Sequence, residues 1–560
     1  MTSARSGLTR RDVLGGLAAA GAGALLAPAA ATAAVMPARR LSRLAVGAVD
    51  GLSPVLAPGR AFVLAGVQWS SPSVARIELR SRFRGGEWGP WGLASVRGHE
   101  PDHGTDARMP SGEPLWLGPA DEVQLRSSQP VADVVVAFVA AAPQSRLAPA
   151  SSARAAASLP LAQPVLAAGG GQPPIVARSA WAGHDAPPAA GPFYGSVALA
   201  FVHHTDNPNG YAAADVPAML LAIYDYHRYA NGWNDIGYNF VIDAFGRIWE
   251  ARAGGIDEPV IGAQAGGYNA VSTGVAILGT FMSAVPTAAA MSALQRLLAW
   301  KLALHGVPAL GTVTVEVDPS AAFYTPFAPG QVVELPRIAG HRDGDLTDCP
   351  GDDLYAQLPA LRTQVAAATG TTLQLTLQSP TRTASPAAPV MLTGTLSELA
   401  GGPVAAAPIE IQTITGLGRS TTITRTATDA GGHWTAPVTL TRSSVIRALH
   451  SAAPAAVSTV IAIGLMPQIA LSVVSASPPL IAGTITPSKP NVTIDIYRLA
   501  GSVRRLVLSR RVPVSAGRFA SRLTLGPRAH GRYMIVARSA ADEVTLAGRS
   551  APVSLKIRSG

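Results

Sequence analysis

Four side chains of the kinds that bind transition metals lie in two short segments of this 560-residue chain. His203 and His204 end the apolar run VALAFVHHT, and His341 and Cys349 lie in AGHRDGDLTDCPGDD. Imidazole and thiolate suit Zn²⁺, and a catalytic zinc site uses three protein ligands with a fourth position open for water. These residue types predict a zinc site, although the spacing alone leaves a structural role open for each histidine.

Cys349 is the only cysteine, which excludes an intramolecular disulfide framework. It could pack as a small apolar residue, bind a metal or act as a nucleophile. Carboxylates at Asp345 and Asp348 would raise rather than lower a thiol pKa, so the nucleophile ranks last. Asp343, Asp345 and Asp348 could orient ligands, but we expect at least two of them to be solvated loop residues.

The elements around these segments alternate between strands and helices. VALAFVHHT, GYNFVID, GRIWEAR and TGVAILGTF are strand-like, whereas residues 215–230, 288–306 and 355–369 have helical spacing. This alternation predicts a central α/β domain with a mixed sheet flanked by helices, at residues 174–368. Strand ends in such folds present chemistry, which is where His203 lies. Residues 307–338 read as an inserted β-hairpin near the site.

The flanking regions have a different texture. Residues 41–142 show short strand-like runs and predict an all-β accessory module, and the Ala-, Pro- and Gly-rich residues 143–173 predict a linker. Beyond Gly370 the pattern LTGTL…GGHW returns as IAGTI…AGRF, about 85–89 residues later. That period predicts two immunoglobulin-like β-sandwiches, at 371–466 and 467–560.

The net charge of +10 is concentrated in the last predicted module. Residues 467–560 hold 14 Lys and Arg against three acids, or +11, which leaves −1 for the rest. We expect this module to bind anionic cell-wall polymers rather than nucleic acid; the alternative is a merely solvated basic face.

The first 34 residues resemble an export signal. Arg10 and Arg11 precede an apolar run that is too short for a membrane anchor, and Ala31-Thr32-Ala33 offers a cleavage site. We therefore expect export by the Tat route, a secreted or wall-associated bacterial protein, and no transmembrane segment in its mature form.

FVHHT, GWNDIGYNFVIDAFGRIWEAR, GAQAGGYNAVSTGVAILG and GHRDGDLTDCPG, in this order, resemble the peptidoglycan recognition proteins, which are type 2 N-acetylmuramoyl-L-alanine amidases. The resemblance covers residues 174–365. It implies that His203, His341 and Cys349 bind zinc, and that Tyr238 and Thr347 stabilise the attacking water or the developing oxyanion. The implied reaction is hydrolysis of the lactoyl amide between N-acetylmuramic acid and the L-alanine of peptidoglycan.

Several further residues near these motifs are candidates for structural or substrate-contact roles. His204 should face away from His203 and is expected to be structural, and His227 is expected to pack behind the ligands. His204 is nevertheless kept as a candidate for substrate contact, together with Trp233, Gln264 and Asn269. Gln264 replaces a histidine found in many members, and EARAGGID replaces the GRGWN of members that favour diaminopimelate-type peptides. The alternative function is a non-catalytic peptidoglycan receptor, a class that commonly loses the zinc cysteine.

Overall fold

The computed structural model describes residues 41–69, 76–94, 114–140 and 171–557, the last range with gaps at 323, 387, 477, 502 and 525–529. The expected export signal and nearly all of the expected linker lie outside the described residues. Among the described residues, none of the helices combines the length and the apolar character needed to cross a membrane.

A six-stranded mixed sheet forms the centre of the molecule, in the order β14-β8-β11-β9-β10-β7. Only β9 and β10 pair antiparallel, and the other neighbours pair in parallel. This confirms the predicted α/β layer structure. The strands are β7 (Ile175–Val176), β8 (Leu199–His204), β9 (Phe240–Ile242), β10 (Ile248–Glu250), β11 (Ser272–Ile277) and β14 (Ile338–Gly340).

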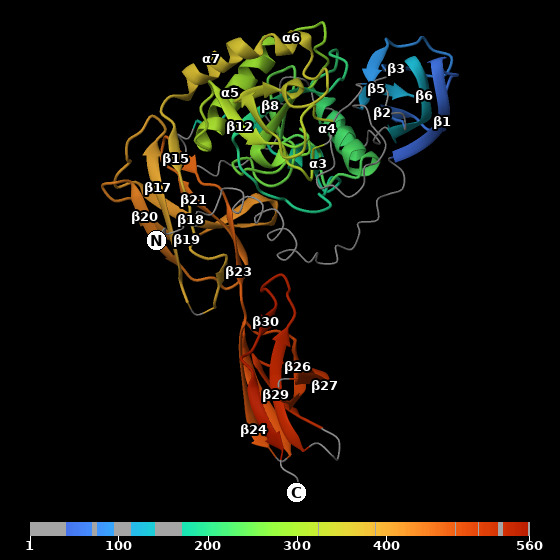
Figure 1. The fold of residues 1–560 in the computed structure, drawn as a ribbon. Coiled ribbons are helices and arrows are strands. Elements are labelled where there is room, and N and C mark those ends of the chain that lie inside the picture. Colours follow the sequence, from blue (N-terminus) through green and yellow to red (C-terminus); the bar gives the residue numbers. More distant parts are fainter. Residues whose placement is uncertain are drawn as a thin grey trace, which may run out of the picture.

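Helices cover both faces of this sheet (Figure 1). Ala200, Val202 and Ile277 point from the strands to the α5 side, and Val241 and Ala276 point to the α4 side. The long helix α5 begins after Thr287, whose Oγ1 accepts a hydrogen bond from Ala290 N at 3.1 Å. The helices are α3 (Ser179–Ala182), α4 (Val216–Asp225) with its π-helical continuation η2 (Tyr226–Ala230), α5 (Ala288–Leu304), α6 (Asp352–Tyr355) and α7 (Leu358–Thr369), with 3-10 turns η3 (Asn269–Val271), η4 (His341–Asp343) and η5 (Gly416–Gly418).

The expected hairpin is present as the antiparallel pair β12 (Thr312–Glu316) and β13 (Val332–Pro336). Its apolar residues Val315 and Leu335 pack against Phe201 of β8. The loop between the two strands reaches the segment that carries Cys349, because Tyr324 O accepts from Leu346 N at 2.7 Å. The hairpin therefore supports the loop that carries Cys349.

The N-terminal module is an all-β sheet that docks on α4 (Figure 1). Leu64 and Val139 of this module share one apolar cluster with Leu220 of α4, and Arg43 donates to the carbonyls of Tyr229 and Ala230 in η2. Its strands are β1 (Leu41–Leu52), β2 (Phe62–Gln68), β3 (Ile77–Arg82), β4 (Gly92–Ala94), β5 (Leu115–Ala120) and β6 (Glu122–Ala140).

The first C-terminal module packs two sheets, β15-β17-β20 and β16-β23-β21-β18-β19, around one core. β22 pairs with β21 at the side of the second sheet. Its strands are β15 (Leu373–Leu375), β16 (Thr383–Ala384), β17 (Val390–Glu398), β18 (Pro408–Thr415), β19 (Arg419–Ala427), β20 (His433–Val438), β21 (Ser444–His450), β22 (Ala456–Val457) and β23 (Ile461–Leu465).

The second module repeats the plan with sheets β24-β25-β28 and β27-β26-β29-β30, where β31 also pairs with β29, and it extends away from the rest of the molecule (Figure 1). Its strands are β24 (Gln468–Ala476), β25 (Pro479–Thr486), β26 (Asn491–Ala500), β27 (Val503–Pro513), β28 (Arg518–Arg522), β29 (Gly531–Ser539), β30 (Gly548–Arg549) and β31 (Val553–Ile557). Whether either module has immunoglobulin topology stays a prediction, as do the domain boundaries.

The glycines matched in the sequence repeat occupy equivalent places in the two modules. Gly394 lies opposite Trp434, and Gly483 lies opposite Phe519. A Cβ at either glycine would come within 2.4 Å of the facing ring. Glycine is therefore required at both positions for the same reason, which is close approach of an aromatic side chain.

The first C-terminal module is joined to the central domain through a buried ion cluster. Arg447 of β21 lies 2.7 Å from the carboxylate of Asp257 and 2.6 Å from that of Glu258, and all three side chains are buried. Lys301 of α5 donates to the carbonyl of Glu258 at 2.8 Å. Leu449 of the same strand joins the central apolar cluster, so this module completes the core of the central domain.

Candidate metal centre

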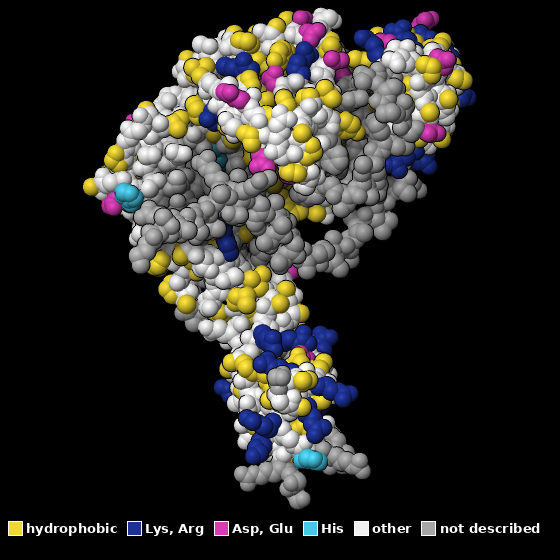
Figure 2. All heavy atoms as spheres, viewed as in Figure 1, with side chains coloured by type: hydrophobic (Ala, Val, Ile, Leu, Met, Phe, Trp, Pro, Cys, Tyr) yellow, Lys and Arg dark blue, Asp and Glu magenta, His cyan; other side chains and the backbone are white. Residues whose placement is uncertain are grey.

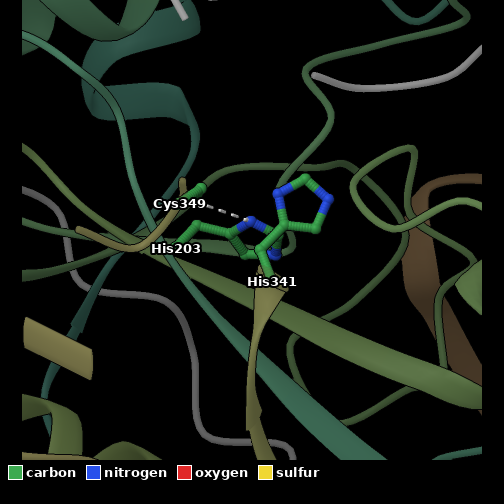
Figure 3. A group of neighbouring side chains, drawn as sticks. All are labelled: His203, His341 and Cys349. Atoms are coloured by element: carbon green, nitrogen blue, oxygen red, sulfur yellow. Dashed lines mark hydrogen bonds between the residues drawn. The ribbon is translucent and has the colours of Figure 1, made fainter. Parts of the chain in front are cut away.

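Three buried side chains converge at the ends of β8 and β14 (Figure 3). His203 is the penultimate residue of β8, His341 follows β14 directly, and Cys349 lies eight residues later in the chain. Their ligand atoms all lie within 4.8 Å of one another. The pairing of β14 with β8 brings together residues that are 138 positions apart in the sequence.

A chain of hydrogen bonds fixes the ring of His203. Ser272 Oγ donates to the carbonyl of Tyr268 and accepts from Gln264 Nε2, both at 2.9 Å. Gln264 Oε1, which can only accept, therefore faces His203 Nε2 at 2.5 Å, so the proton of this ring lies on Nε2. Nδ1 keeps its lone pair and lies 3.7 Å from Cys349 Sγ.

A second acceptor holds His341 in the same way. Asp345 Oδ2 lies 2.9 Å from His341 Nε2 and accepts a further bond from Gly266 N at 2.7 Å. A carboxylate behind a ligating imidazole orients the ring and raises its basicity. Of the three acids in this loop, Asp345 is the one that orients a ligand in the described structure, whereas Asp343 accepts from Gly340 N and Tyr355 OH.

Burial sets the protonation of the cluster. It lowers the pKa of His203 well below its ordinary value, and the nearby His341 lowers it further. Burial also lowers the pKa of His341 to about 3. It raises the pKa of Asp345 well above the ordinary value, against the lowering effect of the Gly266 N–H. Both imidazoles are thus neutral at pH 7, the form that binds a metal.

Cys349 completes the donor set. Its sulfur accepts a hydrogen bond from His204 N at 3.4 Å. The 3.7 Å between Sγ and His203 Nδ1 is close to the roughly 3.6 Å that separates sulfur and nitrogen ligands of one tetrahedral zinc ion. Two neutral imidazoles and a thiolate at this spacing fit Zn²⁺.

The two predicted catalytic residues adjoin this cluster. The ring of Tyr238 is buried and its centroid lies 5.4 Å from that of His203. Thr347 Oγ1 accepts from Cys349 N at 3.1 Å, which positions the cysteine and leaves the hydroxyl proton able to donate. The roles of Tyr238 and Thr347 stay predictions.

The four candidates for substrate contact are all buried and bonded inside the protein. His204 Nδ1 accepts from Phe281 N at 3.3 Å on the α5 side of the sheet, as expected for a structural residue. The ring of Trp233 packs at a tilt against that of His227, with centroids 4.5 Å apart. Asn269 Oδ1 accepts from Gln264 N at 2.8 Å. Substrate contact by His204, Trp233, Gln264 or Asn269 stays a prediction.

Sequence reasoning missed the positioning roles of Gln264 and Ser272. Gln264 is marked in the sequence only by its departure from the family's histidine, and no motif marks Ser272. Their contact depends on the turn between residues 264 and 272, which spacing alone does not reveal.

Comparison with known proteins gives two matches to family descriptions. Residues 193–352 match "N-acetylmuramoyl-L-alanine amidase", and residues 24–157 match "Rv3811 N-terminal galactose-binding domain-like". The first range contains all three residues of the candidate metal centre. The second corresponds to the N-terminal β module.

Individual relatives share the central domain. Peptidoglycan-recognition protein 2 of Holotrichia diomphalia is 35% identical over 194 residues, which is 34% of this chain and 87% of the relative. The N-acetylmuramoyl-L-alanine amidase of Homo sapiens is 30% identical over 157 residues, 28% of this chain and 22% of the relative. The solved structure of Drosophila PGRP-LB is 26% identical over 33% of this chain and 92% of that chain, with a TM-score of 0.26.

Proposed function

Because this chain belongs to the family of peptidoglycan recognition proteins and type 2 N-acetylmuramoyl-L-alanine amidases, we propose that it is a zinc-dependent amidase. Its substrate is peptidoglycan, and the bond cleaved is the lactoyl amide between N-acetylmuramic acid and L-alanine. The observation that carries this proposal is the joint presence of His203, His341 and Cys349 with an acceptor behind each imidazole.

One group of residues would bind the zinc ion, and a second would stabilise the reaction's oxyanion. His203 Nδ1, His341 and Cys349 would hold the zinc, which when bound supplies a Lewis acid and lowers the pKa of a water. Gln264 and Asp345 keep both Nε2 protons pointed away from it. Tyr238 and Thr347 would each donate a hydrogen bond to the oxyanion that forms at the scissile carbonyl, an interaction worth about 3 kcal/mol per donor.

The experiment is an end-group assay on peptidoglycan. Full-length protein should release stem peptides with new L-alanine amino termini, detected by mass spectrometry. A chelator should stop the release, and added Zn²⁺ should restore it. Release that persists after complete removal of zinc would contradict a zinc amidase.

We also propose that the protein reaches its substrate by Tat export and stays at the wall. The support is Arg10 and Arg11 ahead of the short apolar run, and the family's substrate. The Arg10→Lys, Arg11→Lys double variant should accumulate in the cytoplasm. Export equal to wild type, measured by cell fractionation, would remove this idea.

A further inference from the structure

Lys and Arg side chains gather on the second C-terminal module (Figure 2), and some of them line one face of one of its sheets. Ile494, Ile496 and Ile535 belong to the core, so they mark the inner face of the sheet built from β26, β27, β29, β30 and β31. Alternation along β26 places Thr493 and Leu499 on the outer face. Residues directly opposite in antiparallel strands share that face.

The cross-strand register aligns six exposed cations in two rows on this outer face. Leu499 lies opposite Arg504 and Arg532, and Arg532 lies opposite Lys556. Thr493 lies opposite Arg511 and Arg538, and Arg538 lies opposite Arg549. We call these six residues the cationic face: Arg504, Arg511, Arg532, Arg538, Arg549 and Lys556.

The like charges of the cationic face destabilise the folded module when no ligand is bound. Two of its pairs, Arg532 with Lys556 and Arg538 with Arg549, place like charges directly opposite each other, which destabilises a sheet. Asp495 is the single acid in the described strands of this sheet, and it pairs with Arg538. Repulsion that packing does not require indicates selection for a ligand of opposite charge.

The geometry suits a linear polyanion. Six residues of β26 separate the two rows, about 20 Å along the strand. Within a row, the cations of β27 and β29 are two strands apart, about 10 Å. Five of the six cations are arginines, whose planar guanidinium binds phosphate oxygens in pairs.

We propose that the cationic face binds a wall polymer whose backbone carries phosphodiester groups. The choice of a wall polymer over nucleic acid rests on the proposed function, which places this protein at peptidoglycan. The face would hold the protein at the wall while the metal centre acts on the peptide.

The test compares two variants of the full chain that lose the same charge. Arg532→Gln, Lys556→Gln removes one facing pair from the cationic face. Arg518→Gln, Arg522→Gln removes two exposed arginines from β28, in the opposite sheet of the same module. Binding to teichoic-acid-bearing walls is measured by sedimentation over a range of salt concentrations.

We expect the first variant to bind walls more weakly. The magnitude of its negative slope of log K against log[salt] should be smaller than that of wild type by about two. Its melting temperature should not fall, because a repulsion is removed. The second variant should keep the wild-type slope, and walls stripped of phosphodiester polymers with cold hydrofluoric acid should lose binding.

Equal loss of binding in both variants, or undiminished binding to stripped walls, would overturn the proposal. A DNA duplex that binds more tightly than the wall polymer at equal phosphate concentration would assign the face to nucleic acid instead. Cleavage of soluble muropeptide is measured in parallel. Protein that binds walls through the cationic face but does not cleave muropeptide would contradict the proposed amidase activity. The proposed polymer-binding site would still be supported.

Discussion

The side-chain oxygen of Gln264 lies 2.5 Å from Nε2 of His203, and this contact fixes which nitrogen of that ring can bind a metal. Gln264→Met keeps the volume but removes the acceptor, so His203 can turn over or change tautomer. We expect zinc affinity to fall about 10- to 100-fold, measured by competition with a chromophoric chelator.

Gln264→Glu is the matched control, because it keeps an oxygen at the same place. It should retain most of the zinc affinity. If Gln264→Met bound zinc as tightly as wild type, Gln264 would be no more than a packing residue.

Asp345 holds the ring of His341 through Nε2, as Gln264 holds that of His203. Asp345→Leu should weaken zinc binding by a similar factor, again read by chelator competition. Asp348, exposed in the same loop, supplies the control. Asp348→Leu should leave the dissociation constant unchanged, and an equal effect of both changes would argue that the loop as a whole matters rather than the His341 contact.

Arg447 should be necessary for stable packing of the first C-terminal module against the central domain. Arg447→Met leaves the carboxylates of Asp257 and Glu258 buried without their cation, which costs about 3–5 kcal/mol. Scanning calorimetry should show the transition that contains both units moved to lower temperature.

The comparison is Arg425→Met, which breaks the exposed pair with Glu410 on the same module. That change should cost less than about 1 kcal/mol. A transition unmoved by Arg447→Met would show that the apolar contact alone joins the two units.

Because His227 is buried, we expect the free energy of unfolding to fall in mild acid. Burial, with a smaller contribution from Arg252, lowers its folded-state pKa to about 3, while the unfolded chain has an ordinary pKa near 6.5. The unfolded state therefore binds more protons between these values, so stability falls as the pH drops below about 6.5. The loss from this residue is about 2 kcal/mol by pH 5.

In wild type, Gly237 N donates a hydrogen bond to His227 Nδ1 at 3.1 Å. His227→Asn keeps an acceptor for this bond, but the asparagine side chain cannot titrate. Denaturant unfolding at pH 7 and pH 5 should show a smaller difference for this variant than for wild type. An identical difference would mean that other groups carry the acid sensitivity.

Much of the central domain could be predicted from the sequence. β8 is a continuous apolar run that ends at His204, and α5 has clear helical spacing. Period-2 alternation also predicted that His203 and His204 face opposite sides, as the structure shows. These features depend on local pattern, which a single sequence displays.

Contacts between distant turns could not be predicted. The bond from Asp345 to His341 and Gly266, and that from Gln264 to Ser272, depend on how three loops meet at one sheet edge. The Arg447 cluster likewise joins residues about 190 positions apart, and no local pattern marks it. Sequence spacing gives the candidates for such contacts, but the pairing of strands decides which of them meet.

The most direct test of the central claim is the Cys349→Ser variant in the end-group assay with intact peptidoglycan. The full chain should release L-alanine amino termini, and Cys349→Ser should lose the release together with its bound zinc while still sedimenting with peptidoglycan. Full release by Cys349→Ser, or none by the zinc-loaded wild type, would contradict the assignment of an amidase.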